Sequence, residues 1–180
     1  ESVVFKVSVT LRLVFKYIIF IVFFQCSCVA YAITLNDSSA LENIEHELNK
    51  QPLQTYELLL SQAEQIDNMY GDYKSWWLIR KAQAENLLYF FDKFEQTVEQ
   101  TIASVSKLTP IKIMINLDIF RGIILQRQGR YRLSETTLRK AQQAALNHKF
   151  TYLAVHAKQE LAYTRSLTQV YHSSLTELQQ

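Results

Sequence analysis

Few side chains in this sequence are spaced for chemistry. Among the four histidines, His156 has a carboxylate one helical turn away, at Glu160. Such a pair could supply two metal ligands, but a zinc site needs about four in a tetrahedral array. The sequence brings no third ligand to this pair. We therefore expect a solvated ion pair here, and no metal site.

Nucleophilic and phosphate-binding motifs are missing as well. No serine lies in a G-x-S-x-G elbow, and the three glycines are too isolated to form a phosphate-binding loop. Trp76 and Trp77 could form a ligand platform, although such a pair on an amphipathic helix usually places at least one ring in the core. The sequence thus predicts a non-catalytic fragment without a cofactor.

One stretch, QRQGRYRLSETTLRKAQQAAL (126–146), is rich in basic side chains and holds a single acid. Its cations are Arg127, Arg130, Arg132, Arg139 and Lys140. A nucleic-acid surface needs such residues on one face of a basic domain. The net charge of the chain is only +2, and residues 33–180 carry sixteen basic and sixteen acidic side chains. We therefore expect no nucleic-acid partner.

The N-terminus has the order of a secretory signal peptide. Three basic residues precede the apolar run at 17–24, and small residues then lead to Ala30-Tyr31-Ala32. We predict that residues 1–32 are a signal peptide cleaved after Ala32, which places the remainder in the periplasm or outside the cell. An apolar run extended through QCSCVAYA leaves an uncleaved membrane anchor as the alternative.

Both cysteines, Cys26 and Cys28, lie within that segment, so the exported body contains no disulfide. The whole 180-residue chain is 48% hydrophobic and has only three Gly and two Pro. This composition favours long helices packed around one core. Pro52 and Pro110 are each expected to open a helix.

The segment IKIMINLDIF (111–120) is ambiguous, because its apolar residues alternate as they do in a half-buried strand. Ile111, Ile115, Ile119 and Ile123 also recur at four-residue steps, and no other segment offers a partner strand. A lone strand would leave its backbone groups unpaired. We predict a helix.

An aromatic residue followed three positions later by a small hydroxylated one recurs along the chain. The pairs are Phe94 and Thr97, Tyr131 and Ser134, and Tyr171 and Ser174. The aromatics are 37 residues apart (94 to 131) and then 40 apart (131 to 171). Repeats of this length bury their apolar faces by stacking on one another.

These positions resemble the tetratricopeptide repeat, a helix-turn-helix unit of about 34 residues. In the best unit, 115–147, the matching residues are Gly122 at the close approach of helices, Gly129 at the turn, Tyr131 as the aromatic, Ser134 and Ala141 as small packing residues, and Leu138 as the large apolar one. Ala162 matches the small position of the next unit, whereas Glu85 and Gln169 depart from the pattern. The resemblance implies an all-α fold over 33–180. Its antiparallel helix pairs would stack as a right-handed superhelical array behind the N-terminal signal or anchor helix.

A secretory signal followed by degenerate repeats also resembles the periplasmic sensor region of bacterial membrane-bound GGDEF diguanylate cyclases and histidine kinases. That resemblance implies a sensory, protein-interaction module, whose membrane helix and catalytic domain would follow a domain truncated here at Gln180. A free periplasmic or outer-membrane assembly scaffold is the alternative. The membrane would be reached through the N-terminal segment, if it is uncleaved, or through the later helix.

In this family the first helices of the pairs line a groove, so we expect a peptide, a protein segment or a small ligand to bind there. The positions that match are Asn86, Tyr89, Asn116, Gln126, Arg127, His156, Gln159 and Tyr163. Arg127 would pair with a carboxylate of the ligand.

Overall fold

The computed structural model describes residues 38–66 and 72–178. All the secondary structure in these ranges is helical, which confirms the predicted all-α class. The chain separates into two compact units, Glu1–Ala40 and Leu41–Gln180, and the architecture below is that of the second. The predicted signal segment, 1–32, lies outside the described residues.

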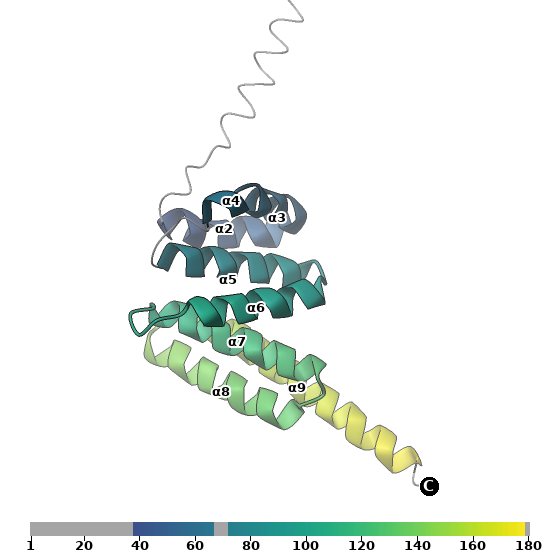
Figure 1. Cartoon of the computed structure of the whole chain (residues 1–180). Coiled ribbons are helices and arrows are strands. Elements are labelled where there is room, and N and C mark those ends of the chain that lie inside the picture. The colour runs from purple at the N-terminus through teal and green to yellow at the C-terminus, as the bar shows by residue number, and fades with distance from the viewer. Residues whose placement is uncertain (1–37, 67–71, 179–180) are drawn as a thin grey trace, which may run out of the picture. The chain divides into compact units, whose positions relative to one another are not determined.

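The helices follow one another with short connections (Figure 1). They are α2 (Ser38–Lys50), α3 (Pro52–Ser61), α4 (Ala63–Ile66), α5 (Asp72–Leu87), α6 (Phe91–Ser104), α7 (Ile111–Arg127), α8 (Tyr131–Asn147) and α9 (Thr151–Leu178). Pro52 and Pro110 stand at the starts of α3 and α7, as predicted.

The ambiguous segment 111–120 is the first part of helix α7. Its alternating isoleucines arise because this helix is buried on most of its circumference, with both Ile113 and Ile115 almost fully enclosed. A helix covered on all sides needs no polar stripe. The alternation therefore reflects the central position of α7 and not an extended backbone.

Three tight turns, at 88–90, 128–130 and 148–150, reverse the chain between α5 and α6, α7 and α8, and α8 and α9. In each turn one residue has a left-handed backbone: Tyr89 (φ 61°), Gly129 (φ 71°) or Lys149 (φ 59°). The amide of the following residue donates to a carbonyl five positions back, as from Arg130 to Leu125 at 2.9 Å. This is the Schellman arrangement that ends many helices. The three connections therefore share one backbone geometry.

The predicted packing residues of the best unit meet where α7 crosses α8. Ser134 is fully buried, and its hydroxyl donates to the Gly122 carbonyl oxygen at 2.8 Å. Leu138 and Ala141 are also fully buried. One unit earlier, Phe94 packs edge-on against Phe120 with 5.5 Å between the ring centroids, and Thr97 is buried beside it on α6.

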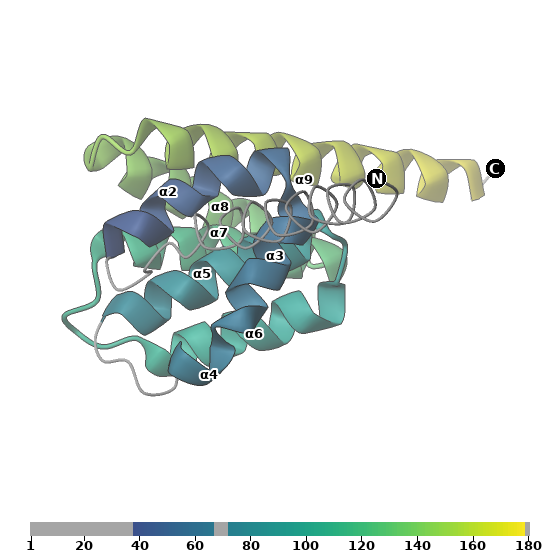
Figure 2. The same cartoon turned by 90° about the horizontal axis from the view of Figure 1, so that it is seen from above.

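The prediction for α9 was less accurate. Ala162 is exposed, and the buried side chains are Leu161 and Thr164 on either side of it. Ala162 therefore does not pack between helices, because the buried stripe of α9 runs along a different face. The side chains of Tyr171 and Ser174 lie outside the described residues. The last turns of α9 extend beyond α8 (Figures 1 and 2).

Helices α2 and α3 do not form a pair like the later ones. Only Gln51 separates them, and Figure 2 shows α3 running at a steep angle to α5, against which it packs. The buried Arg80 side chain ties α2 to α5. Its Nε donates to the Leu41 carbonyl oxygen at 2.7 Å, and its guanidinium forms a 3.0 Å ion pair with Glu45.

Candidate binding groove

A groove of about 1020 Å³ opens along α5, α7 and α9, where the turns after α5 and α7 meet the middle of α9. Six of the eight predicted groove residues line it: Asn86, Tyr89, Gln126, Arg127, Gln159 and Tyr163. They come from α5 and the turn after it, from α7 and from α9, which are far apart in sequence. The tight turns position them, because each turn holds the end of one helix against its successor.

A smaller compartment of about 220 Å³ continues from this groove. The two share Asn86, Leu87, Gln159 and Glu160. The smaller one is walled by Glu45, Leu48 and Asn49 of α2 and by Tyr152 and His156 of α9, with Gln83 and Phe120 between them. The structure thus places His156, the seventh predicted residue, next to the other six.

Asn116 does not line the groove, contrary to prediction. It is only 1% exposed, and its Nδ2 donates to the Lys112 carbonyl oxygen at 2.8 Å. Because α7 is buried on most sides, a side chain in its first half has no open face to occupy. Gln126 is also mainly structural, since its Nε2 donates to the Glu160 carbonyl oxygen (2.8 Å) and to the Thr164 hydroxyl (2.6 Å).

Arg127 lies at the centre of the groove. Its guanidinium carbon is 3.5 Å from the centroid of the Phe91 ring, and it donates to the Asn86 side-chain oxygen at 2.6 Å. Within residues 38–66 and 72–178, no carboxylate oxygen lies within 4.0 Å of it. Burial holds the pKa of Arg127 below its usual value, while Glu160 and Glu95 act to raise it. Arg127 is thus an exposed cation that is stacked on Phe91 and held by Asn86, with Glu95 and Glu160 nearby. Its expected pairing with a ligand carboxylate stays a prediction.

Four carboxylates line the two compartments: Glu45, Asp92, Glu95 and Glu160. Burial raises the pKa of Glu160, against the lowering effect of its neighbours Gln126 and Arg127. Glu45 pairs with Arg80 through Oε2, whereas its Oε1 is buried and accepts no hydrogen bond. This set of acids outnumbers the cations that face it.

His156 is not the solvated partner that the sequence suggested. Its Nε2 is 3.8 Å from the Glu160 carboxylate, but the two side chains are only 20% and 24% exposed. Its Nδ1 is buried without a hydrogen-bond partner. Burial lowers the pKa of His156, and Glu45 acts in the opposite direction. Among the described residues, no cluster of three or more His, Cys, Asp or Glu could hold a metal.

Exposed aromatic rings form one rim of the groove. Tyr89 and Tyr163 are 76% and 56% exposed. Tyr89 contacts Phe91 edge-on, with ring centroids 5.6 Å apart. The two tyrosines were predicted from the sequence, whereas Phe91 and Asp92 were not, and Glu160 was predicted only as the partner of His156.

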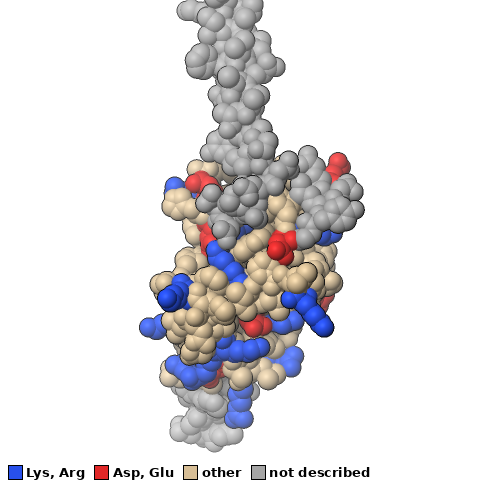
Figure 3. Space-filling view, turned by 90° about the vertical axis from the view of Figure 1, so that its left-hand side faces the viewer, with Lys and Arg blue, Asp and Glu red and all other residues tan. Residues whose placement is uncertain are grey.

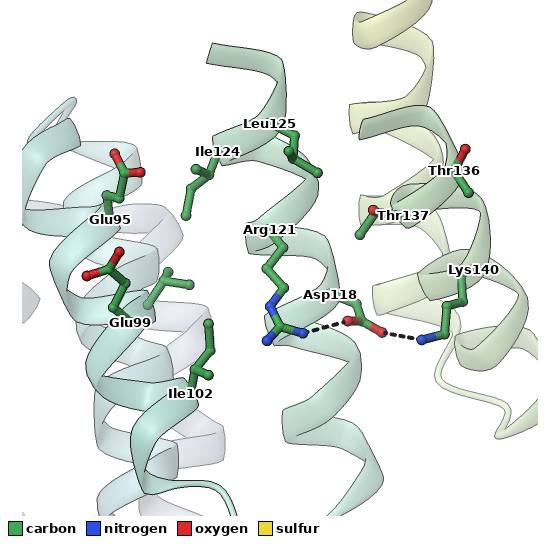
Figure 4. A pocket seen from close by; sticks show the side chains of 11 residues that line it. Glu95, Glu99, Ile102, Asp118, Arg121, Ile124, Leu125, Thr136, Thr137 and Lys140 are labelled. Atoms are coloured by element: carbon green, nitrogen blue, oxygen red, sulfur yellow. Dashed lines mark ion pairs between the residues drawn. The ribbon is translucent and has the colours of Figure 1, made fainter. Parts of the chain in front are cut away.

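A second hollow of about 490 Å³ lies between α6, α7 and α8 (Figure 4). Its apolar residues are Val98, Ile102, Ile124 and Leu125, and Asp118 stands at one side between Arg121 (3.5 Å) and Lys140 (3.8 Å). No residue singled out for ligand binding in the sequence lines it. Arg121 and Lys140 both pair with Asp118, so the two cations of this hollow are already compensated.

The basic stretch at 126–146 is not a continuous positive surface. Arg139 and Arg165 both contact the Glu135 carboxylate, at 2.6 and 3.1 Å. Lys140 pairs with Asp118, and Arg127 is stacked on Phe91. Figure 3 shows Lys and Arg side chains distributed over one face of the described residues, with Asp and Glu among them.

No protein-family model, curated protein or solved structure matches this chain. Within 38–66 and 72–178, no helix is both long enough and apolar enough to cross a membrane. The groove is therefore interpreted from its own residues and geometry.

Proposed function

We propose that residues 33–180 form an exported, non-catalytic binding module built as a tetratricopeptide-like, right-handed superhelical array. The groove along α5, α7 and α9 would hold a segment of another protein. The module would serve as the sensory or protein-interaction region of a bacterial membrane-bound signalling protein.

The observation that carries this proposal is the convergence of seven side chains, from three helices and the turn after α5, on one groove and its smaller extension. Its polar groups are mixed with exposed aromatic rings, as in sites that bind peptides. The equivalent turns and the contact between Gly122 and α8 support the array, because they repeat one helix-pair geometry along the chain. A groove with these polar and aromatic side chains can bind a peptide without any catalytic group.

Binding is tested by selecting peptides from an unbiased random library on the immobilised chain. Tyr163→Ala combined with Gln159→Lys should abolish capture of the selected peptides, because one change removes the rim ring and the other fills the groove with a long side chain. Thr137→Lys, in the hollow between α6 and α8, is the matched control and should leave capture unchanged. Equal loss in both variants, or no selected peptide at all, would contradict a binding groove at this place.

Export is tested separately with alkaline phosphatase, a reporter that is active only outside the bacterial cytoplasm. Fused behind residues 1–40, it should be active, and fused behind 33–40 alone, it should be inactive. The mass of the exported chain then distinguishes cleavage after Ala32 from an uncleaved anchor. Equal activity of the two fusions would contradict the proposed signal.

A further inference from the structure

The acids and aromatic rings of the groove indicate what kind of segment it binds. We propose that the groove takes an extended, basic segment of a partner protein, whose Lys or Arg side chains lie among Asp92, Glu95 and Glu160 and against the rings of Tyr89 and Tyr163. This inference rests on the proposed function and specifies its ligand.

The charge balance is the first observation. In the larger compartment three carboxylates, from Asp92, Glu95 and Glu160, surround a single cation, Arg127. In the smaller one, Glu45 already pairs with the buried Arg80, so the excess of negative charge lies in the larger compartment. Complementary charge is what selects a partner and excludes wrong ones. A basic segment would complete this set, and an acidic one would meet uncompensated carboxylates.

Arg127 provides the second observation, because it shows how this groove holds a cation. Its guanidinium lies over the face of Phe91 and is fixed from the side by Asn86. Aromatic faces attract cations through their quadrupoles. Among the described residues, no cation lies over Tyr89 or Tyr163, which rim the same groove. These two rings can receive the side chains of a ligand in the way that Phe91 receives Arg127.

The backbone of Tyr89 is the third observation. Its φ of 61° lies in the left-handed region, which disfavours residues with a side chain. Gly129 occupies the equivalent turn after α7. Lys149 shares this backbone outside the groove, so it is the position of the Tyr89 ring, 76% exposed beside the groove, that makes it available to a ligand.

The continuity of the two compartments suits an extended peptide segment. The larger compartment alone has about 1020 Å³, and the smaller continues it past Asn86 toward Glu45. An extended segment can follow this path and place successive side chains in both compartments.

The charge test uses the peptides selected from an unbiased random library. We expect them to be enriched in Lys and Arg relative to the input. Asp92→Asn with Glu160→Gln should weaken their binding about tenfold or more, as for loss of charge pairs in a partly buried site. Glu99→Gln removes a carboxylate one turn beyond Glu95 on α6 that lines the neighbouring hollow and not the groove, so it should leave binding unchanged.

Selected peptides that are acidic or neutral, but that still lose binding with Tyr163→Ala, would overturn the basic ligand and leave the groove intact. Equal weakening by Glu99→Gln would also overturn it, because binding would then follow overall charge. A library that yields no peptide would instead contradict the proposed function itself.

The role of Tyr89 has its own matched control. Tyr89→Gly and Lys149→Gly should each raise Tm by a few degrees, because both remove a side chain from a left-handed position. Only Tyr89→Gly should weaken the binding of the selected peptides, since Lys149 lies outside the groove. If the Tyr89→Gly variant binds the peptides as tightly as the wild type does, the Tyr89 side chain has no part in recognition.

Discussion

Gly122 and Leu138 are in direct contact across α7 and α8. A Cβ added at Gly122 would lie 2.5 Å from both Cγ and Cδ2 of Leu138, closer than such atoms approach in proteins. Leu138 is fully buried and so has no open space into which to withdraw. The hydrogen bond from Ser134 to the Gly122 carbonyl fixes the same crossing.

Gly122→Ala should therefore destabilise the protein by about 1 to 3 kcal/mol through overpacking, measured as the free energy of unfolding in urea. A matched test shows whether Leu138 is the cause. In a Leu138→Ala background, Gly122→Ala should be neutral or stabilising, because the clash is gone and alanine favours the helix. An equal penalty in both backgrounds would place the strain elsewhere.

A substitution at Gly129 tests the backbone conformation of the turn without disturbing side-chain packing. Nothing lies within 4 Å of a Cβ built there, so a substitution meets only the cost of its φ of +71°. Gly129→Ala should lower stability by about 1 kcal/mol, as seen by thermal unfolding. A loss much larger than this would mean that the turn is crowded by neighbours.

Arg80 should hold α2 in place. It is 1% exposed and binds both the Leu41 carbonyl and Glu45. Arg80→Met leaves these groups uncompensated and should cost about 3 kcal/mol. Hydrogen exchange should rise at 41–50 before it rises in α7 and α8.

The control for Arg80 is Arg139→Met, which breaks an exposed ion pair with Glu135 and should cost well under 1 kcal/mol. If α2 keeps its protection in Arg80→Met, other contacts secure that helix.

His156 should make stability depend on pH. Because burial lowers its pKa below 6.5 in the folded state, the unfolded chain takes up the proton first as the pH falls. Stability is therefore lost below pH 6.5, by at most about 1.4 kcal/mol per pH unit. Of the acids facing it, Glu45 acts against this shift. Glu160, whose pKa is raised, becomes less destabilising as the pH falls toward 4.5.

The effect of His156 is isolated by comparing the wild type with His156→Gln in urea between pH 7.5 and 5.5. The stability advantage of the wild type should shrink toward the lower pH. A constant difference across this range would exclude a buried neutral imidazole.

The helical class and the site of the closest crossing could be predicted from sequence, because they depend on residues with narrow roles. A side chain at Gly122 would prevent the close approach of the two helices, and one at Gly129 would disfavour the left-handed turn. Ser134 and Leu138 follow at helical spacing. The strand-like pattern at 111–120 was resolved correctly because no partner strand was available. Such features are local, so one segment is enough to identify them.

Other features could not be predicted because they depend on distant parts of the chain. Tyr89 and Lys149 occupy turns equivalent to that of Gly129, yet neither residue type favours a left-handed backbone. Arg80 is charged and gave no signal of burial, since its partners lie on α2. Asn116 was assigned to the groove from its position in a repeat, but the surrounding helices bury it. The smaller compartment exists only because α2 faces α9.

The most direct test of a binding groove along α5, α7 and α9 is the amide NMR spectrum of the isotope-labelled chain, titrated with a library-selected peptide. The largest shift changes are expected at 86–95, 123–131 and 156–167, which contain most of the residues that line the groove. The amide shifts around Val98, Thr137 and Lys140, in the hollow between α6 and α8, are expected to stay unchanged. Shift changes confined to that hollow would contradict a binding groove along α5, α7 and α9.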